Sequence, residues 1–171
     1  MKRCGWAKEG DALLLAYHDR EYGRQRKGDV ALFEKLCLEC LQAGLSWRTV
    51  LYKRDALREV FHGFDISMVA DMNSADIERL MQDSRIIRNR RKIAAVIHNA
   101  RKITLIICEK HSLYDFFYTF SSGKALFADL KQRGFQFTGE TICTAFLESI
   151  GAMEGHQEGC FLHGQCMDQY I

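Results

Sequence analysis

The chain has 171 residues, of which 47% are hydrophobic and 27% charged, and its formal net charge is +2. These values are ordinary for one soluble globular domain, and no apolar run approaches the ~20 residues that a membrane-spanning helix needs. Seven cysteines, an odd number, argue against a disulfide framework and favour reduced thiols in a cytoplasmic protein. The first residues lack the apolar stretch of a signal peptide, so we expect no secretory leader.

Helical periodicity recurs along the chain, and no proline interrupts it. The clearest case is residues 29–43, whose apolar side chains follow the i, i+3, i+4, i+7 spacing behind Asp29 as N-cap. Ser74 is expected to cap a later helix without a capping box. Further helices are predicted over residues 47–61, 66–71, 74–82, 86–108, 112–120, 123–133 and 139–151. Strand-like alternation is confined to residues 134–137, so we expect an all-α fold, a single compact helical domain spanning residues 1–171.

Candidate metal ligands lie at the two ends of the chain. Cys4 and His18 are near the start, and His156 and Cys160 are near the finish; we refer to these four as the Cys/His quartet. Two thiolates and two imidazoles form the tetrahedral ligand set of a closed, structural zinc site. Such a site would tie the N-terminal segment to the C-terminal segment.

Spacing alone leaves other ligand sets open, because the chain has 7 Cys and 6 His. His163 and Cys166 form a second C-terminal pair that could replace one ligand of the quartet. Cys37 and Cys40 form a C-x-x-C pair that could hold a rival metal or carry redox chemistry. That pair lies in a continuous apolar helix, where cysteines more often belong to the core.

Glu39 is the clearest candidate for a functional carboxylate. It lies between apolar neighbours, and an unpaired buried charge is costly, so this side chain is expected to be partnered or functional. The aromatic residues with polar tips near it in sequence are Trp6, Tyr17, Tyr22 and Trp47. Together they could form a cage that stacks on a flat cationic ligand. The simpler alternatives are a solvent-facing glutamate and an ordinary aromatic core.

A basic run follows a predicted turn between two helices. Five cationic side chains lie within residues 85–92, directly after Asp83 and Ser84. A helix N-terminus binds phosphate through its free backbone N–H groups, and cations beside it suit a DNA backbone. The alternative is a solvated helix face, which is what most charge runs are.

Several short motifs, taken together, resemble the DNA-3-methyladenine glycosylase I family of the helix-hairpin-helix DNA glycosylase superfamily. The similarity covers nearly the whole chain in order. The motifs are Cys4-Gly5-Trp6, Ala16-Tyr17-His18-Asp19, Leu38-Glu39, Gln42-Ala43-Gly44-Leu45-Ser46-Trp47, Ile86-Ile87-Arg88-Asn89, Gly134-Phe135-x-Phe137-x-Gly139-x-Thr141 and His156-x3-Cys160.

The resemblance implies a pocket for an alkylated base. By family position, Glu39 would be the catalytic-site carboxylate that accepts hydrogen bonds from the base edge. Tyr17 and Trp47 would stack on the base or line the slot, with Trp6 and Tyr22 as second choices. Tyr22 stands where the family has tryptophan.

The resemblance also implies a helix-hairpin-helix that contacts DNA through Ser84, Arg85, Arg88 and Arg90, and structural Zn²⁺ on the Cys/His quartet. Arg85 stands where the family typically has glycine, which permits the positive φ and close phosphate approach of such a turn.

The activity that the resemblance implies is base-excision repair. A monomeric cytoplasmic enzyme would flip an alkylated nucleotide out of double-stranded DNA, hydrolyse the N-glycosidic bond and release free 3-methyladenine. Because the alkylated base is cationic and already a good leaving group, no strong general acid is required. The alternative is a catalytically impaired, zinc-containing DNA-binding module of the same fold.

Overall fold

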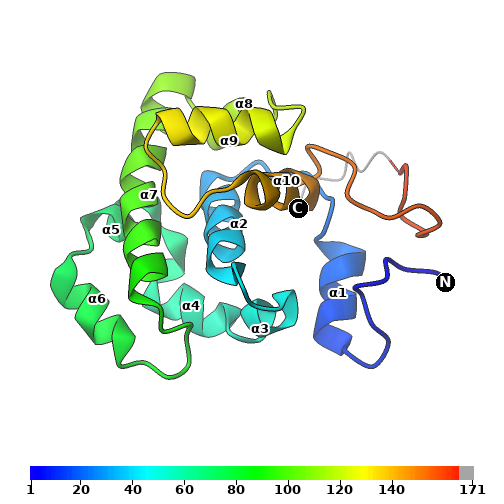
Figure 1. The fold of residues 1–171 in the computed structure, drawn as a ribbon, viewed down its shortest axis with the longest axis horizontal. Helices are drawn as coiled ribbons and strands as arrows, with labels where there is room; N and C mark the ends of the chain where they lie inside the picture. Colours follow the sequence, from blue (N-terminus) through cyan, green and yellow to red (C-terminus); the bar gives the residue numbers. More distant parts are fainter. Residues whose placement is uncertain (166–171) are drawn as a thin grey trace.

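The computed structural model describes residues 1–165, which form helices joined by loops and contain no strand, so the all-α prediction is confirmed for this part of the chain (Figure 1). None of these helices is long and apolar enough to cross a membrane. In chain order the elements are α1 (Ala12–Arg20), α2 (Asp29–Gln42), α3 (Trp47–Tyr52), α4 (Arg54–Val60), the 3₁₀ helix η1 (His62–Phe64), α5 (Ile66–Asp71), α6 (Ser74–Met81), α7 (Arg90–Lys110), α8 (Leu113–Phe117), α9 (Gly123–Gln132) and α10 (Glu140–Ser149).

Helix α2 is the centre of the molecule (Figure 1). Residues 32–41 are buried without a break, so this helix has no solvent-facing side along that stretch. A helix that is covered all round must be packed on every face, and α3, η1, α7, α8 and α10 all contact it. One continuous hydrophobic core runs from Leu32 to Ile150, in agreement with a single compact domain.

Helix α7 begins later than the predicted range of 86–108, so the predicted start is wrong. Asn89 is the N-cap, and its side chain accepts a hydrogen bond from the Lys92 backbone N–H at 3.2 Å. Residues 82–89 instead form a hairpin between α6 and α7. Ile86 and Ile87 are buried and attach this hairpin to the core. The apolar side chains of Ile86 and Ile87 fit the helical periodicity of α7, which is why the predicted helix starts too early.

Other local expectations were also wrong. Helix α2 is capped by Gly28 rather than Asp29, whose carboxylate instead accepts the Leu113 backbone N–H at 2.8 Å. Helix α6 is capped by Asn73 rather than Ser74, and Asp76 completes a capping box by accepting the Asn73 backbone N–H at 3.0 Å. The predicted helix 47–61 is divided at Lys53, which leaves helical geometry with φ −101° and ψ 0°. Residues 134–137, where the sequence alternates as in a strand, lie in an irregular loop in which Gly134 and Phe137 have positive φ. Helix α1 was not delimited from the sequence.

The N-terminal segment lies beside the loop that follows α10 (Figure 1). The backbone N–H of Phe161 donates to the carbonyl of Lys2 at 2.9 Å, and that of Gly23 donates to Ser149 at 3.1 Å. These two hydrogen bonds connect the residues on either side of α1 with α10 and the loop that follows it, and so hold α1 against the rest of the fold.

Candidate functional site

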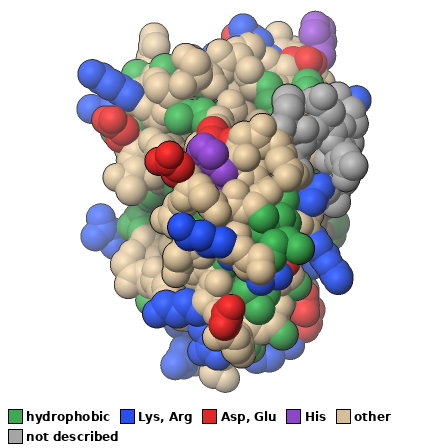
Figure 2. Space-filling view, turned by 90° about the vertical axis from the view of Figure 1, so that its right-hand side faces the viewer, with side chains coloured by type: hydrophobic (Ala, Val, Ile, Leu, Met, Phe, Trp, Pro, Cys, Tyr) green, Lys and Arg blue, Asp and Glu red, His purple; other side chains and the backbone are tan. Residues whose placement is uncertain are grey.

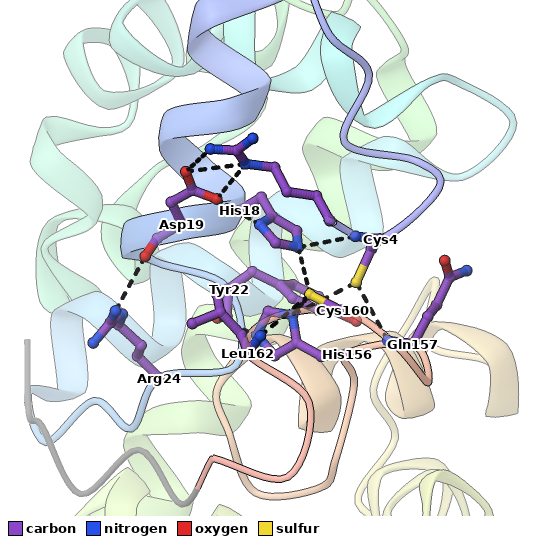
Figure 3. A network of polar contacts seen from close by, with 10 residues as sticks. Cys4, His18, Asp19, Tyr22, Arg24, His156, Gln157, Cys160 and Leu162 are labelled. Carbon is purple, nitrogen blue, oxygen red and sulfur yellow. Dashed lines mark hydrogen bonds and ion pairs between the residues drawn. The ribbon is translucent and has the colours of Figure 1, made fainter. Parts of the chain in front are cut away.

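The Cys/His quartet comes together as the sequence predicted (Figure 3). Cys4 and His18 belong to the N-terminal segment and α1, and His156 and Cys160 to the loop after α10. All four side chains are buried, and their ligand atoms lie within 4.8 Å of one another. Cys160 Sγ is 3.5 Å from His18 Nε2, and Cys4 Sγ is 3.6 Å from His156 Nδ1. Tetrahedral zinc would separate sulfur and nitrogen ligands by about 3.5 Å.

The two imidazoles are held by further polar contacts, as in metal sites with an ordered outer shell. His18 Nδ1 is 2.8 Å from the Asp19 carboxylate, which also binds the guanidinium of Arg3. The hydrogen bonds from Arg3 hold the pKa of Asp19 at about 2, so this carboxylate is ionised at neutral pH. His156 Nε2 lies 3.2 Å from the Tyr22 carbonyl. Each ring therefore directs its other nitrogen to the centre of the quartet.

Backbone N–H groups point at the two sulfurs (Figure 3). The N–H of Gln157 donates to Cys4 Sγ at 3.3 Å, and that of Leu162 donates to Cys160 Sγ at 3.5 Å. Such donors stabilise thiolates, the form in which cysteine binds metal. The donor set, its burial and its spacing therefore fit a structural zinc ion.

The rival cysteine and histidine sets lie elsewhere. His163 is exposed, and its Nδ1 is 2.6 Å from the carbonyl of His156, outside the quartet. Cys166 lies outside the described residues. Cys37 and Cys40 are buried in α2, where desolvation raises the pKa of both thiols. These two cysteines thus pack as core residues.

A cavity of about 510 Å³ opens beside the quartet and receives all five side chains that were assigned to a base pocket. Its volume is within the usual range for small-ligand sites, about 300–1,000 Å³. We call this cavity the base pocket; it is lined by Trp6, Lys8, Leu14, Tyr17, Tyr22, Glu39, Gln42, Ser46, Trp47, Arg48 and Ala145. Sequence reasoning did not assign Lys8, Gln42, Ser46 or Arg48.

The aromatic rings of the pocket touch one another. The ring centroids of Tyr17 and Trp47 are 5.1 Å apart, and those of Trp6 and Tyr22 are 5.0 Å apart. A flat base between two rings needs about 7 Å, twice the contact distance of carbon atoms. In this arrangement Tyr17 and Trp47 therefore form one wall of the pocket and do not enclose a slot between them.

Glu39 lies at the floor of the pocket on α2 and is 5% exposed. Its Oε1 is 3.2 Å from the ammonium of Lys35, one helical turn earlier. Burial raises the pKa of Glu39 above its ordinary value, and the positive charge of Lys35 opposes part of that shift. The solvent-facing alternative for Glu39 is therefore wrong, because the carboxylate is buried and partnered.

Lys35 is the functional candidate that sequence reasoning missed. Its Nζ lies 4.0 Å from the Trp47 ring and 4.4 Å from the Tyr17 ring, and it donates a hydrogen bond to the Tyr17 hydroxyl. Burial lowers the pKa of Lys35 to about 8. The available signal was a lysine four residues before Glu39 within a stretch of apolar side chains, since i and i+4 residues meet on a helix.

The hairpin places Ser84 and Arg85 at the surface, as the DNA-binding prediction requires. The Arg85 guanidinium binds Asp83 at 2.7 Å and Glu59 at 2.8 Å. The ammonium of Lys53 binds the Arg85 carbonyl at 2.8 Å. Because Lys53 directly follows α3, which begins at the pocket residue Trp47, one short helix connects the hairpin to the base pocket.

The other two predicted DNA contacts differ in their surroundings. Arg90 is paired with the carboxylate of Glu78. Arg88 is exposed and makes no ion pair within residues 1–165. Figure 2 shows the side of the molecule near the N-terminus, where Lys and Arg side chains are spread over the lower half around a few acidic groups. Because Arg85 and Arg90 are paired with carboxylates and Arg88 is not within residues 1–165, Arg88 is the hairpin cation whose charge is most available to a phosphate.

Comparison with known proteins gives a consistent result. The methyladenine glycosylase family model matches residues 6–128 and 121–163. The chain is 42% identical over 180 residues to DNA-3-methyladenine glycosylase 1 of Escherichia coli (strain K12), with 94% of this chain and 96% of the relative covered. It is 39% identical to DNA-3-methyladenine glycosylase of Haemophilus influenzae (strain ATCC 51907 / DSM 11121 / KW20 / Rd), with 92% and 96% covered.

Solved structures agree with that result. A crystal structure of 3-methyladenine DNA glycosylase I has a TM-score of 0.88 at 40% identity, with 95% of this chain and all 100% of the other covered. A structure that describes 3-methyladenine recognition by the Staphylococcus aureus enzyme has a TM-score of 0.87 at 32% identity, with 94% and 95% covered. A variant of 3-methyladenine DNA glycosylase I in complex with 3-methyladenine has a TM-score of 0.87 at 31% identity, with 94% and 96% covered.

Proposed function

Because this chain belongs to the methyladenine glycosylase family, we propose that it is a DNA-3-methyladenine glycosylase that releases 3-methyladenine from alkylated DNA in base-excision repair. The observation that supports this most strongly is the meeting of Glu39 and four aromatic side chains around one cavity. A carboxylate among aromatic rings is suited to a flat purine with hydrogen-bond donors on its edge.

The reaction is a hydrolysis that begins with a cationic leaving group. The alkylated nucleotide leaves the stack and its base enters the pocket. The bond between C1′ and the base then breaks, its electron pair neutralises the base, and positive charge develops on the sugar. Water adds to C1′ and loses a proton. The protein lowers the barrier by binding this charge distribution better than it binds the substrate.

The residues of the pocket have separate tasks in this proposal. Glu39 accepts hydrogen bonds from the base edge and fixes which edge faces the floor. Tyr17 and Trp47 offer one apolar wall for the ring. Tyr22 is fixed by its hydroxyl, whose single proton faces two acceptors, the Glu148 carboxylate at 3.3 Å and the Gly155 carbonyl at 3.1 Å. It therefore closes the pocket from the side of the Cys/His quartet.

Zinc has a structural task in this proposal. Four protein ligands fill a tetrahedral ion and leave no open position for substrate or water. The ion would cross-link the two ends of the chain and fix the pocket rings beside it. Trp6 packs against His18 with ring centroids 5.2 Å apart, and Tyr22 packs against His156 at 5.1 Å.

The hairpin, together with α6 and α7, would serve as the helix-hairpin-helix that binds double-stranded DNA. Arg48 at the rim of the base pocket and Arg88 on the hairpin support this, because cations on a protein surface attract the phosphate backbone. A monomeric state and a cytoplasmic location stay predictions from the sequence.

The deciding experiment is incubation with N-methylated duplex DNA followed by chromatographic identification of any released base. We expect 3-methyladenine, with release strongly reduced for Glu39→Gln. Binding to a duplex with an abasic-site analogue without any base release would contradict the proposal and favour the DNA-binding module.

A further inference from the structure

Arg48 is a cation at the mouth of the base pocket. Its side chain lines the cavity and is at the same time 63% exposed. It directly follows the pocket residue Trp47 in the first turn of α3, so this turn fixes the cation relative to the aromatic wall. A flipped base enters such a pocket while its sugar and phosphates remain outside with the strand. The phosphates of a base that packs on Trp47 therefore lie on the side where Arg48 meets solvent.

Two neighbours hold the Arg48 guanidinium in one orientation. Its Nε donates to the Asp11 carboxylate at 2.5 Å, and its Cζ lies over the Tyr52 ring, 4.7 Å from the centroid. Asp11 is fixed in turn as the N-cap of α1, where it accepts the Leu14 backbone N–H at 3.1 Å. These contacts order the side chain before a ligand binds, which lowers the entropic cost of binding.

The edge of the guanidinium that carries the two Nη groups has no carboxylate partner within residues 1–165. The hairpin arginines differ in this respect. Arg85 binds Glu59 through both of its Nη atoms. Arg90 binds Glu78 in the same way. Because two parallel N–H donors suit a phosphate in bidentate geometry, Arg48 is paired with Asp11 and still open to an anion.

Lys8 brings a second positive charge to the same cavity. It is exposed on the loop before α1 and lines the base pocket. The charged side chains that line the cavity are therefore two cations and Glu39, whose carboxylate is balanced by Lys35. Such a mouth attracts a phosphate group.

We propose that Arg48 binds a phosphate next to the flipped nucleotide and holds that nucleotide in its extruded position, with Lys8 as a weaker second contact. This inference rests on the proposed function, because it assigns a further part of the same substrate. It goes beyond a general attraction of DNA, since the contact forms when the base enters the pocket and draws the phosphate to the mouth.

The proposed contact has a consequence for the reaction. Extrusion of a nucleotide sacrifices stacking and pairing, so contacts that form only in the extruded state raise its population. A bidentate bond between arginine and phosphate is stronger than a neutral hydrogen bond. Arg48 thus increases the fraction of DNA that is ready for base release, although it does not touch the reacting bond.

The test compares two duplexes of one sequence, one unmodified and one with a tetrahydrofuran abasic analogue at its centre. The proteins are the full zinc-loaded wild type, Arg48→Met and Arg48→Lys. Arg48→Met should bind the abasic duplex more weakly by on the order of tenfold, and the unmodified duplex by less than about threefold. Arg48→Lys should recover only part of that loss, because lysine keeps the charge but not the bidentate geometry.

Two further variants calibrate these changes. Lys8→Met should weaken binding of the abasic duplex by about threefold, because its ammonium is a flexible point charge. Lys110→Met, at the end of α7, is the control and should change neither affinity. A larger loss for Lys8→Met than for Arg48→Met would overturn the assignment of Arg48 as the principal contact.

The outcomes separate this inference from the proposed function. Equal losses of Arg48→Met on the two duplexes, or no loss on either, would overturn the role of Arg48. Both results leave the proposed function standing if the wild type releases 3-methyladenine from methylated duplex. A wild type that releases no base would overturn the proposed function and this inference with it.

A second measurement excludes a merely structural role for Arg48. In single-turnover release from methylated duplex, Arg48→Met should lower the maximal rate by on the order of tenfold, because fewer nucleotides are extruded. Its affinity for free 3-methyladenine, measured by calorimetric titration, should stay within about threefold of the wild type, since the free base has no phosphate. Loss of base affinity in both Arg48 variants would show that Arg48 supports the pocket itself, and would overturn the proposal.

Discussion

The Cys/His quartet and the pocket floor both bury polar groups, yet the fold holds them in different ways. The quartet joins segments that are more than 130 residues apart and has only a small apolar surround, which includes Leu162 and Phe161. Lys35 and Glu39 lie one turn apart on α2, inside the continuous core. We therefore expect the quartet to need a bound cation to keep its geometry, whereas the core alone sets the geometry of the pocket floor.

The strongest test of this difference removes a ligand of the quartet. Cys160→Ala should abolish binding of one zinc per chain and lower the free energy of unfolding by on the order of 4 kcal/mol, because loss of a structural metal is among the largest single-residue effects. That change corresponds to a fall in Tm of roughly 10 °C for a chain of this size. Metal analysis measures the zinc bound per chain, and thermal melting measures the fall in Tm.

The matched control is Cys108→Ala, since Cys108 is exposed on α7 and outside the quartet. It should keep its zinc and its Tm. A strong chelator should lower the Tm of the wild type and of this control alike. If Cys160→Ala melts like the wild type, the quartet does not stabilise the fold through a bound metal, and the contrast between the two regions fails.

Glu39→Gln probes the other region. It should reduce kcat/KM for release of 3-methyladenine by on the order of 10–100-fold, because hydrogen bonds to a charged acceptor contribute about 1.5–3 kcal/mol. Zinc content and cooperative melting should persist, since the quartet is unchanged, although the Tm should fall because Lys35 loses its buried counter-ion. A variant that loses activity but keeps its zinc would show that the pocket floor and the quartet can be altered independently. Retained activity in this variant would remove Glu39 from the chemistry.

The pH dependence of stability gives a smaller effect, specific to the floor of the pocket. Burial lowers the pKa of Lys35 from its ordinary value of 10.5 to about 8. Between those values the unfolded chain binds a proton at this site that the folded chain does not, so stability rises with pH across this window. Lys35→Met should remove the rise of stability with pH that Lys35 causes. Denaturant unfolding of the wild type and of this variant from pH 8 to 10 measures that rise. Parallel curves would contradict the shifted pKa.

Local patterns in the sequence predicted most of the helices, because each carries its own periodicity and many carry a cap. The expected range of 29–43 corresponds closely to α2, since its apolar positions recur at helical spacing over four turns. The start of α7 could not be read in the same way. Ile86 and Ile87 fit a helical pattern, and only the fold shows that they anchor a hairpin instead.

The site was predictable where composition was unusual and unpredictable where burial decided the outcome. Scarce tryptophans and terminal cysteine–histidine pairs, strengthened by family resemblance, led to the base pocket and the quartet. Lys35 was not assigned, because lysine is almost never fully buried and its position in the sequence does not by itself show burial. The contact of Tyr17 with Trp47 also depends on how α1 packs against α3, which no local pattern encodes.

The smallest effect is expected far from both regions, at the hairpin, and it tests whether the pocket works apart from DNA binding. Arg88→Ala should weaken binding to unmodified duplex DNA a few-fold and reduce the slope of log K against log salt by about 1, because one phosphate contact is lost. Affinity for free 3-methyladenine should stay the same, since Arg88 is not part of the pocket. Lys110→Ala, at the opposite end of α7, is the matched control and should alter neither quantity. Equal salt slopes for Arg88→Ala and the wild type would place the DNA path elsewhere on the surface.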